Sequence, residues 1–261
     1  DSGTISVHNI TSSGGVSGGG TAGNGGTIQL KTGVAGNTIA QAGSTSLIAL
    51  AGTGAGTAGT DGNLKVISQG AVTLTNTGND VGTLAASVAD NAAAFSYTDA
   101  SALKIGTVSA DGTAPANLGS LSGIATKGGA VTVVAGTTTG STLTLDQAIN
   151  TTPTTLNTAG GAVSLTAGDA ITSTATTGTI TTTGSVSTAG AADTAGAGGE
   201  VLIRHTTGVA NKAITLNAAI VASGGASVEA ADTGGGGGVV TILNDSGTIS
   251  VHNITSSGGV S

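Results

Sequence analysis

The chain has 261 residues, of which 48 are Gly and 38% are hydrophobic, almost all of these Ala, Val, Ile and Leu. Only 7% are charged, and the formal net charge of −7 argues against a nucleic acid or an anionic membrane surface as a partner, because either needs a basic face. The absence of Cys excludes a disulfide scaffold and a thiolate metal site, and no apolar run approaches the roughly 18 residues that span a bilayer.

Short strands are predicted along the whole chain by a recurring triplet of apolar, polar and apolar residues, flanked by glycine. Alternation with a period of two is typical of a strand with one buried and one exposed face. Few turn pairs of the Asn-Gly kind separate these strands, so we expect a parallel β-helix in which each coil pairs with the next. The triplets are Ile28–Leu30, Leu64–Val66, Val72–Leu74, Leu103–Ile105, Val131–Val133, Leu143–Leu145, Val163–Leu165, Ile214–Leu216, Val240–Ile242 and Ile249–Val251.

The two ends of the chain carry the same seventeen residues. Asp1–Ser17 recurs without a change as Asp245–Ser261, which gives a period of 244 residues. We expect residues 1–244 to be one tandem repeat of a continuous β-helix and residues 245–261 to begin the next, within a much longer array. Near-identical copies placed end to end build length, which predicts a fibre or stalk.

Coil length is predicted from glycine pairs that precede several triplets. The steps from Gly129 to Gly161, to Gly199 and to Gly238 are 32, 38 and 39 residues. We interpret each step as nearly two coils of roughly 20 residues, with a glycine-rich excursion at one corner. One repeat then has roughly twelve coils and, at about 4.8 Å per coil, a length of roughly 60 Å. Val, Ile and Leu are expected in stacked columns inside, with Thr and Ser outside.

Four stretches resemble the repeat region of filamentous haemagglutinin-like giant bacterial surface proteins, and the resemblance extends over nearly the whole chain. It implies a right-handed parallel β-helix, secretion, often through a dedicated outer-membrane partner, and a role in adhesion, cell–cell contact or matrix. The stretches are Phe95–Val108, Ser120–Val133, Leu143–Ile149 and Gly160–Ile171.

Catalysis is not expected. The histidines are His8, His205 and His252, the last being the repeat copy of the first, and no Asp or Glu with general-base spacing accompanies them. Arg204 and His205 form the densest polar cluster, which we interpret as a solvated corner. We therefore expect no enzyme, no catalytic residue and no cofactor.

Calcium is a weak alternative at two Gly/Asp turns, around Asp61 and Asp80. A hard cation needs about six oxygen ligands, and isolated Asp turns rarely supply them. Structural turn residues are the favoured interpretation. Phe95 and Tyr97 share a strand face, which we expect to be core rather than a platform for stacking sugars.

Three glycine-rich excursions are the candidate contact surfaces, near Ser13–Gly26, Ala189–Gly199 and Gly224–Gly238. A further alternative is an ice-binding ladder built from Thr73–Thr75, Thr142–Thr144 and Thr179–Thr181. That ladder is disfavoured because Gln29, Lys65 and Lys104 interrupt it. The candidate contact residues are Ser13, Gly20, Asn24, Asp193, Gly198, Asp232 and Gly236.

These observations predict a structural segment of a giant secreted bacterial surface protein that forms an extracellular fibre, filament or stalk. Its expected partners are neighbouring repeats end to end, other filaments side by side, and carbohydrate or a cell surface, with neither nucleic acid binding nor membrane insertion. The alternative is an adhesin module that binds carbohydrate or a partner through the excursions.

Overall fold

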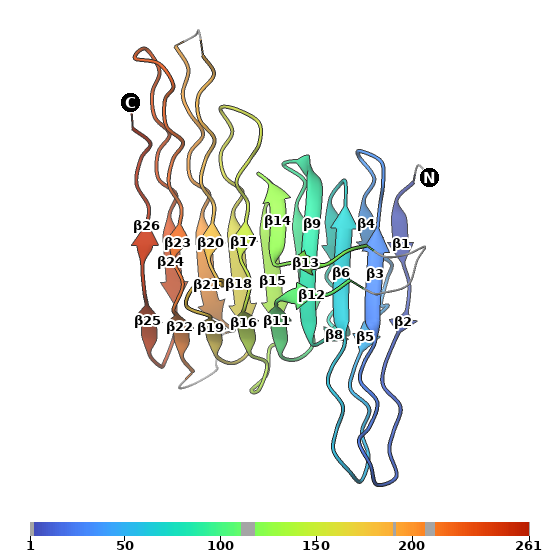
Figure 1. The fold of residues 1–261 in the computed structure, drawn as a ribbon. Coiled ribbons are helices and arrows are strands. Elements are labelled where there is room, and N and C mark those ends of the chain that lie inside the picture. Colours follow the sequence, from blue (N-terminus) through green and yellow to red (C-terminus); the bar gives the residue numbers. More distant parts are fainter. Residues whose placement is uncertain (1–2, 111–117, 190–191, 207–211, 261) are drawn as a thin grey trace.

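The structure is a computed structural model that describes residues 3–110, 118–189, 192–206 and 212–260. In these ranges it holds 26 β-strands and no helix. All ten predicted triplets lie in strands, and nearly every pairing is parallel. The predicted all-β class is confirmed, and the stack of parallel strands in Figure 1 is consistent with a parallel β-helix.

One side of the molecule, here the first wall, is a parallel sheet of eight strands. Each strand pairs with the strand one coil further along, so that Val131, Val163, Val201 and Val240 stand in one column. The strands, in order, are β1 (Ile5–Val7), β4 (Ile39–Gln41), β7 (Val72–Leu74), β10 (Phe95–Asp99), β15 (Val131–Ala135), β18 (Val163–Ala167), β21 (Val201–His205) and β24 (Val240–Leu243).

The opposite side, here the second wall, is a sheet of thirteen strands that branches at its longest member. That strand, β9, pairs with β6 along its length, whereas on its other edge it carries β11 near its start and β14 further along. The members are β3 (Thr27–Lys31), β6 (Asn63–Ser68), β9 (Thr83–Asn91), β11 (Leu103–Ile105), β14 (Ile124–Lys127), β16 (Leu143–Leu145), β17 (Ile149–Asn150), β19 (Ile171–Ser173), β20 (Ile180–Thr181), β22 (Ile214–Leu216), β23 (Ile220–Val221), β25 (Ile249–Val251) and β26 (Ile254–Thr255).

Two small sheets complete the fold. A parallel sheet of three strands, β2 (Ile10–Thr11), β5 (Leu47–Ala49) and β8 (Asp80–Val81), lies between the walls in the first three coils. The pair β12 (Thr107–Val108) and β13 (Leu121–Ser122) is antiparallel and belongs to an insertion between β11 and β14.

The predicted coil length is wrong, because the step between two glycine pairs spans one coil rather than nearly two. Val163 pairs directly with Val201, and Val201 with Val240, at the same spacing as the glycine pairs that precede them. Each excursion consumes residues that we counted as a second coil. The spacing also varies, since Val72 pairs with Phe95 across a much shorter coil. Eight first-wall strands define seven such steps, so the expected twelve coils are not confirmed.

The core is built from stacked columns of inward-facing residues. In the first wall one column contains Phe95, Val131, Val163 and Val201, and all four are at most 1% exposed. Phe95 and Tyr97 are fully buried, which confirms that they belong to the core. Removing such side chains from water supplies most of the stabilisation of a chain with so few charges.

Lys65 departs from the predicted pattern. It is the central residue of a triplet and was expected on the solvated face, yet it is fully buried. The insertion covers it, and its ammonium donates hydrogen bonds to the carbonyl oxygens of Ser109 (2.8 Å) and Gly119 (2.6 Å). Lys65 thus fastens the insertion to the second wall.

The glycine pairs have a packing reason. A Cβ on Gly161 would overlap the carbonyl oxygen of Gly129 one coil earlier, and a Cβ on Gly238 would overlap that of Gly199. Gly199 stands in the same relation to Gly161. Successive coils approach so closely at this corner that only glycine fits.

Candidate functional site

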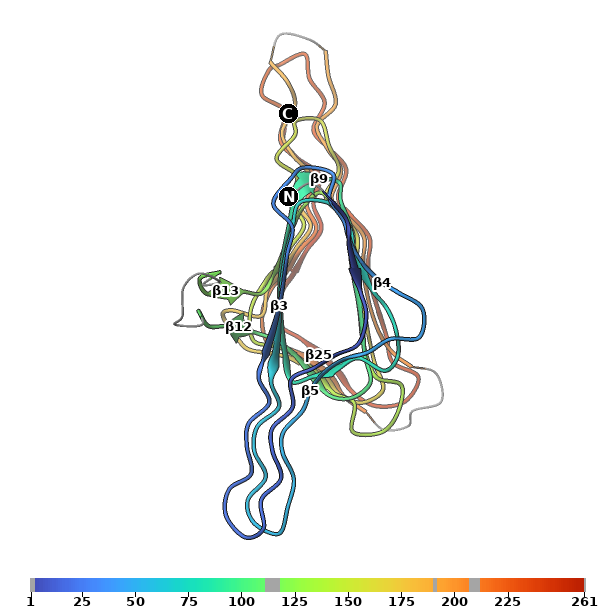
Figure 2. The same cartoon turned by 90° about the vertical axis from the view of Figure 1, so that its right-hand side faces the viewer.

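The glycine-rich excursions project from the molecule as two thin fins at opposite corners (Figures 1 and 2). The first fin comprises residues 12–26, which connect β2 to β3, and residues 50–62, which connect β5 to β6. Both segments thus run from the small sheet to the second wall. The second fin comprises residues 152–160, 183–189, 192–198 and 223–237 and projects from the chain between a second-wall strand and the next first-wall strand. Residues 190–191 of the predicted excursion at Ala189–Gly199 lie outside the described residues.

Each fin is held together by backbone hydrogen bonds in two directions. Between coils, Ser17 N donates to Thr53 O (2.9 Å) and Ala195 N donates to Thr233 O (2.9 Å). Across the two arms of one excursion, Gly23 N donates to Gly15 O (2.9 Å). The arms lie so close that a Cβ on Gly14 would overlap the carbonyl oxygen of Gly23. Glycine is therefore required for the thin shape of the fin.

A hydroxyl group closes the corner before the first-wall strand in three successive coils, and in the second and third of these coils the corner is the base of the second fin. Thr126 Oγ1 donates to Gly129 O (2.5 Å), Thr151 Oγ1 to Gly161 O (2.6 Å) and Thr182 Oγ1 to Gly199 O (2.8 Å). All three threonines are buried. Sequence reasoning missed this repeated clamp, whose signal is a Thr that comes two residues after an inward Ile.

Several predicted contact residues use their polar groups inside the fins. Ser13 Oγ accepts from Leu50 N (3.2 Å), and Asn24 Oδ1 accepts from Thr60 N (2.9 Å). Asp232 is buried, with Oδ2 accepting from Ser187 Oγ (2.5 Å) and Oδ1 from Asp193 N (3.1 Å). These hydrogen bonds lower the pKa of Asp232, the one from Ser187 contributing most. The side chains therefore join one excursion to the next.

The glycines among the predicted contact residues differ in exposure. Gly20 and Gly236 are exposed at the fin surface, whereas Gly198 is half-buried. Gly198 N donates to Gly236 O (2.9 Å), which links two coils of the second fin. The described surface that the fins offer to a partner is consequently mostly backbone and short side chains, with exposed carboxylates at Asp61 and Glu229 and an exposed apolar side chain at Val16.

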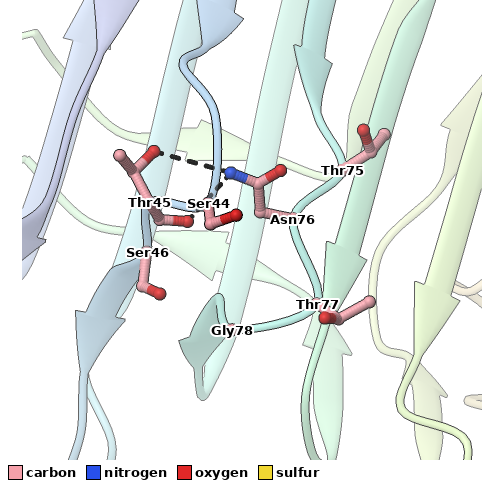
Figure 3. Close-up of a pocket in the computed structure, with 7 residues that line it drawn as sticks. All are labelled: Ser44, Thr45, Ser46, Thr75, Asn76, Thr77 and Gly78. Atoms are coloured by element: carbon pink, nitrogen blue, oxygen red, sulfur yellow. Dashed lines mark hydrogen bonds between the residues drawn. The ribbon is translucent and has the colours of Figure 1, made fainter.

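A hydroxyl-lined hollow of about 310 Å³ lies on the outer surface where the loops before β5 and β8 run side by side (Figure 3). The amide of Asn76 points across it, and its Nδ2 donates to Gly43 O (2.5 Å) and Thr45 O (3.0 Å). The residues that line the hollow are Ser44, Thr45, Ser46, Thr75, Asn76, Thr77 and Gly78.

Beneath the hollow, two amides bind one another across the corner. Asn79 is fully buried, and its Oδ1 accepts from Gln41 Nε2 (2.6 Å) while its Nδ2 donates to Gln41 Oε1 (3.0 Å). Asn79 Nδ2 also lies within hydrogen-bonding distance of Leu74 O and Thr98 O, both at 3.1 Å. The pair satisfies backbone groups that the turn leaves free inside the molecule.

An internal carboxyl group lies next to this corner. Asp99 Oδ2 accepts from Tyr97 Oη (2.7 Å) and Val81 N (3.1 Å), and Oδ1 accepts from Ser101 N (3.0 Å). Burial raises the pKa of Asp99 to about 6, although these hydrogen bonds oppose the rise. Burial and the neighbouring Asp99 likewise raise the pKa of Tyr97 well above its usual value. Neither residue lines the hollow of Figure 3, and both side chains are bound within the core, so we assign this pair to the fold.

The predicted solvated corner at Arg204 and His205 is wrong for the histidine. Arg204 is exposed, but His205 is buried, being the last inward residue of β21 in the column of Asp99 and Ala167. Its Nδ1 lies 3.3 Å from Asn244 Oδ1. A hollow of about 320 Å³ borders both residues and Thr206.

The two calcium candidates lie in separate turns. Asp61 Oδ1 accepts from Ala51 N (2.8 Å), and Asp80 Oδ1 accepts from Ser101 Oγ (2.7 Å). In the part of the chain that the structure describes, no three His, Cys, Asp or Glu side chains gather to hold a metal ion.

The three Thr-x-Thr segments do not share a face. Thr73 belongs to the first wall, whereas Thr144 and Thr181 belong to different branches of the second wall. The outward column of the first wall through Thr73 also contains Ala40, Ser96 and Leu202. A regular threonine ladder is therefore not formed from these segments.

Compared with known protein families, curated proteins and solved structures, the chain matches none. None of the described segments forms a helix with the length and apolar character needed to cross a bilayer.

Proposed function

We propose that the chain is a structural repeat of a giant secreted bacterial surface protein, folded as an elongated right-handed parallel β-helix and serving as an extracellular fibre, filament or stalk. One observation carries the proposal. The parallel ladder runs from the first described strand to the last, and the last two strands, β25 and β26, already belong to a second copy of the chain's beginning. The ladder therefore extends from the first copy of this segment to the second.

The proposed mechanism is mechanical and polyvalent. Hydrogen bonds between coils run along the axis, so a load along the fibre is shared by both walls and both fins. Weak contacts that recur in each repeat add through avidity, either with neighbouring filaments or with a cell surface. The low charge density of the surface limits the repulsion between filaments.

The test is to image chains of one, two and four repeats by cryo-electron microscopy. Seven to eight coils per repeat, spaced about 4.8 Å apart, predict rods that lengthen by about 35 Å with each added repeat. A map of the four-repeat chain also reads the hand of the coil. Rods whose length does not grow with repeat number, or repeats that appear as separate beads, would overturn the proposal.

The second candidate is an adhesin module that binds carbohydrate, and the hollow of Figure 3 favours it because hydroxyl and amide groups line the surface. Sugar hydroxyls are recognised by such groups. Glycan-array binding that is lost on Asn76→Ala and kept on the remote Asn217→Ala would support it. No binding to any glycan by the four-repeat chain would reject it.

A further inference from the structure

The two copies of the repeated segment lie on opposite walls although their sequences are identical. In the first copy, β1 belongs to the first wall and pairs with β4. In the second copy, the same three residues form β25, which belongs to the second wall and pairs with β22. Likewise β2 pairs with β5 in the small sheet, whereas its copy β26 pairs with β23 in the second wall.

The fins repeat this difference. Ser12 to Val16 lie in the first fin, where Gly14 N donates to Leu50 O (2.9 Å). Their copies, Ser256 to Val260, extend the second fin, where Ser227 N donates to Val260 O (2.8 Å) and Gly259 N donates to Gly235 O (2.8 Å). Ser256 Oγ also donates to Gly238 O, at the base of the excursion one coil earlier. The second copy thus enters the opposite corner.

The exchange of corners happens within the repeat, at β9 and β10. In the first two coils an excursion separates the small sheet from the second wall, but in the third coil Gly82 alone joins β8 to β9. This coil is the shortest of the first wall, and Phe95 stacks on Val72. From there on, β9 carries both branches of the second wall, and excursions leave from the other corner.

The glycine-pair motif follows the exchange. After β10, each pair of the form Gly-Gly-x-Val opens a first-wall strand, as at Gly160–Val163, Gly198–Val201 and Gly237–Val240. Before β10, the matching Gly25–Ile28 opens β3, which belongs to the second wall. The motif therefore predicts that a strand follows an excursion, but it does not determine which wall that strand joins.

From these positions we infer that one repeat winds a half-integer number of coils, about seven and a half, so that successive repeats are set on opposite walls and their fins alternate between corners. This inference rests on the proposed function, in which repeats follow one another in one chain. A fibre would then have a structural period of two repeats, about 70 Å, and would offer a fin to neighbours on both sides.

The inference also predicts which segment would pair with β24, the last strand of the first wall. Val239, Leu243 and Val251 at this end of the described chain are 63%, 49% and 41% exposed. The segment is the next copy of residues 18–31, whose strand Thr27–Lys31 would pair with β24 in the first wall. Aligning the glycine pairs places the copy of Ile28 beside Val240 and the copy of Gln29 beside Thr241.

The test uses a two-repeat chain, residues 1–244 followed by residues 1–261, which contains no native cysteine. A disulfide between cysteines at Thr241 and at the second copy of Gln29 would show that successive repeats start on opposite walls. A disulfide between cysteines at Thr241 and at the second copy of Ser6 would show that the second repeat starts on the same wall as the first. Thr132→Cys with Ser164→Cys, paired in adjacent coils, is the positive control. Neighbouring strands bring such pairs within the distance that a disulfide spans.

We expect oxidation to cross-link the Thr241 and Gln29 pair as completely as the control and to leave the Thr241 and Ser6 pair reduced. The opposite result would overturn the half-integer winding and leave the structural proposal standing. If only the control pair forms, the ladder does not continue between repeats, and both proposals fail. A four-repeat map with fins at one corner only would likewise overturn the alternation.

Discussion

Replacing Gly199 by alanine tests whether close approach of coils at the base of the second fin explains the glycine pairs. A Cβ there would overlap the carbonyl oxygen of Gly161 and lie 2.6 Å from that of Gly160, whereas real Cβ atoms stay beyond 3.0 Å. The coils would have to separate, and three hydrogen bonds would lengthen: Gly199 N to Thr182 O (2.6 Å), Thr182 Oγ1 to Gly199 O (2.8 Å) and Val163 N to Glu200 O (2.8 Å).

The expected cost combines overpacking and weakened hydrogen bonds. Overpacking costs about 1 to 3 kcal/mol and each hydrogen bond contributes about 1 kcal/mol, while the lower entropy of the unfolded alanine chain returns about 0.4 to 1 kcal/mol. We therefore expect Gly199→Ala to lower the free energy of unfolding by about 2 to 3 kcal/mol.

The matched control is Gly236→Ala in the same fin. A Cβ at Gly236 would meet no atom within 4 Å, so this change should be neutral or stabilise by up to about 1 kcal/mol. The assay is urea unfolding of both variants, followed by far-UV circular dichroism. Equal midpoints for the two variants, or a Gly199→Ala midpoint at or above that of the unchanged chain, would refute the steric argument.

Three further predictions concern buried polar groups. The pKa of Asp99 is about 6 in the folded chain against 3.8 ordinarily, so the folded state binds this proton more tightly than the unfolded state. The free energy of unfolding should therefore rise as pH falls from 6 towards 4, by about 3 kcal/mol in full. Asp99→Asn should flatten that part of a plot of the urea midpoint against pH. Lys65→Met should speed hydrogen exchange at the amides of residues 118–122 at least tenfold, whereas Lys104→Met, which removes only an exposed ion pair with Asp146, should not. Thr182→Val should lower the free energy of unfolding in urea by about 1 to 3 kcal/mol, because Gly199 O loses its buried donor; an unchanged midpoint would contradict the clamp.

The strands were predictable because a period-two pattern reports burial directly. Triplets such as Val163–Leu165 place two inward residues on either side of an outward one, and these positions are buried as expected. Coil length was not predictable in the same way, because a glycine pair marks one corner of a coil and does not indicate how many strands lie between that corner and the next glycine pair. The excursion after Thr182 takes up a large share of the coil from Val163 to Val201 without adding a wall strand.

The polar interior escaped prediction for a related reason. Asn79 and Asp80 are adjacent in a Gly-Asn-Asp turn, where the sequence suggested Asp80 as a calcium ligand. It is Asn79, however, that points inward and forms hydrogen bonds with Gln41. Lys65 sits where alternation points a side chain outward, and only the insertion, whose Ser109 is 44 residues further along the chain, buries it. Contacts between residues so far apart in sequence leave no local signature.

The wall that a strand joins cannot be predicted from the strand's own residues, because the same segment occurs in both walls. Ile5–Val7 and Ile249–Val251 carry the same residues, and inward columns of Val, Ile and Leu line both sides equally. Local sequence therefore specifies a strand and a fin, while the preceding coil specifies the wall through the strand on which the new one is laid. A single compact coil, in which Gly82 replaces a whole excursion, is then sufficient to exchange the corners for every coil that follows.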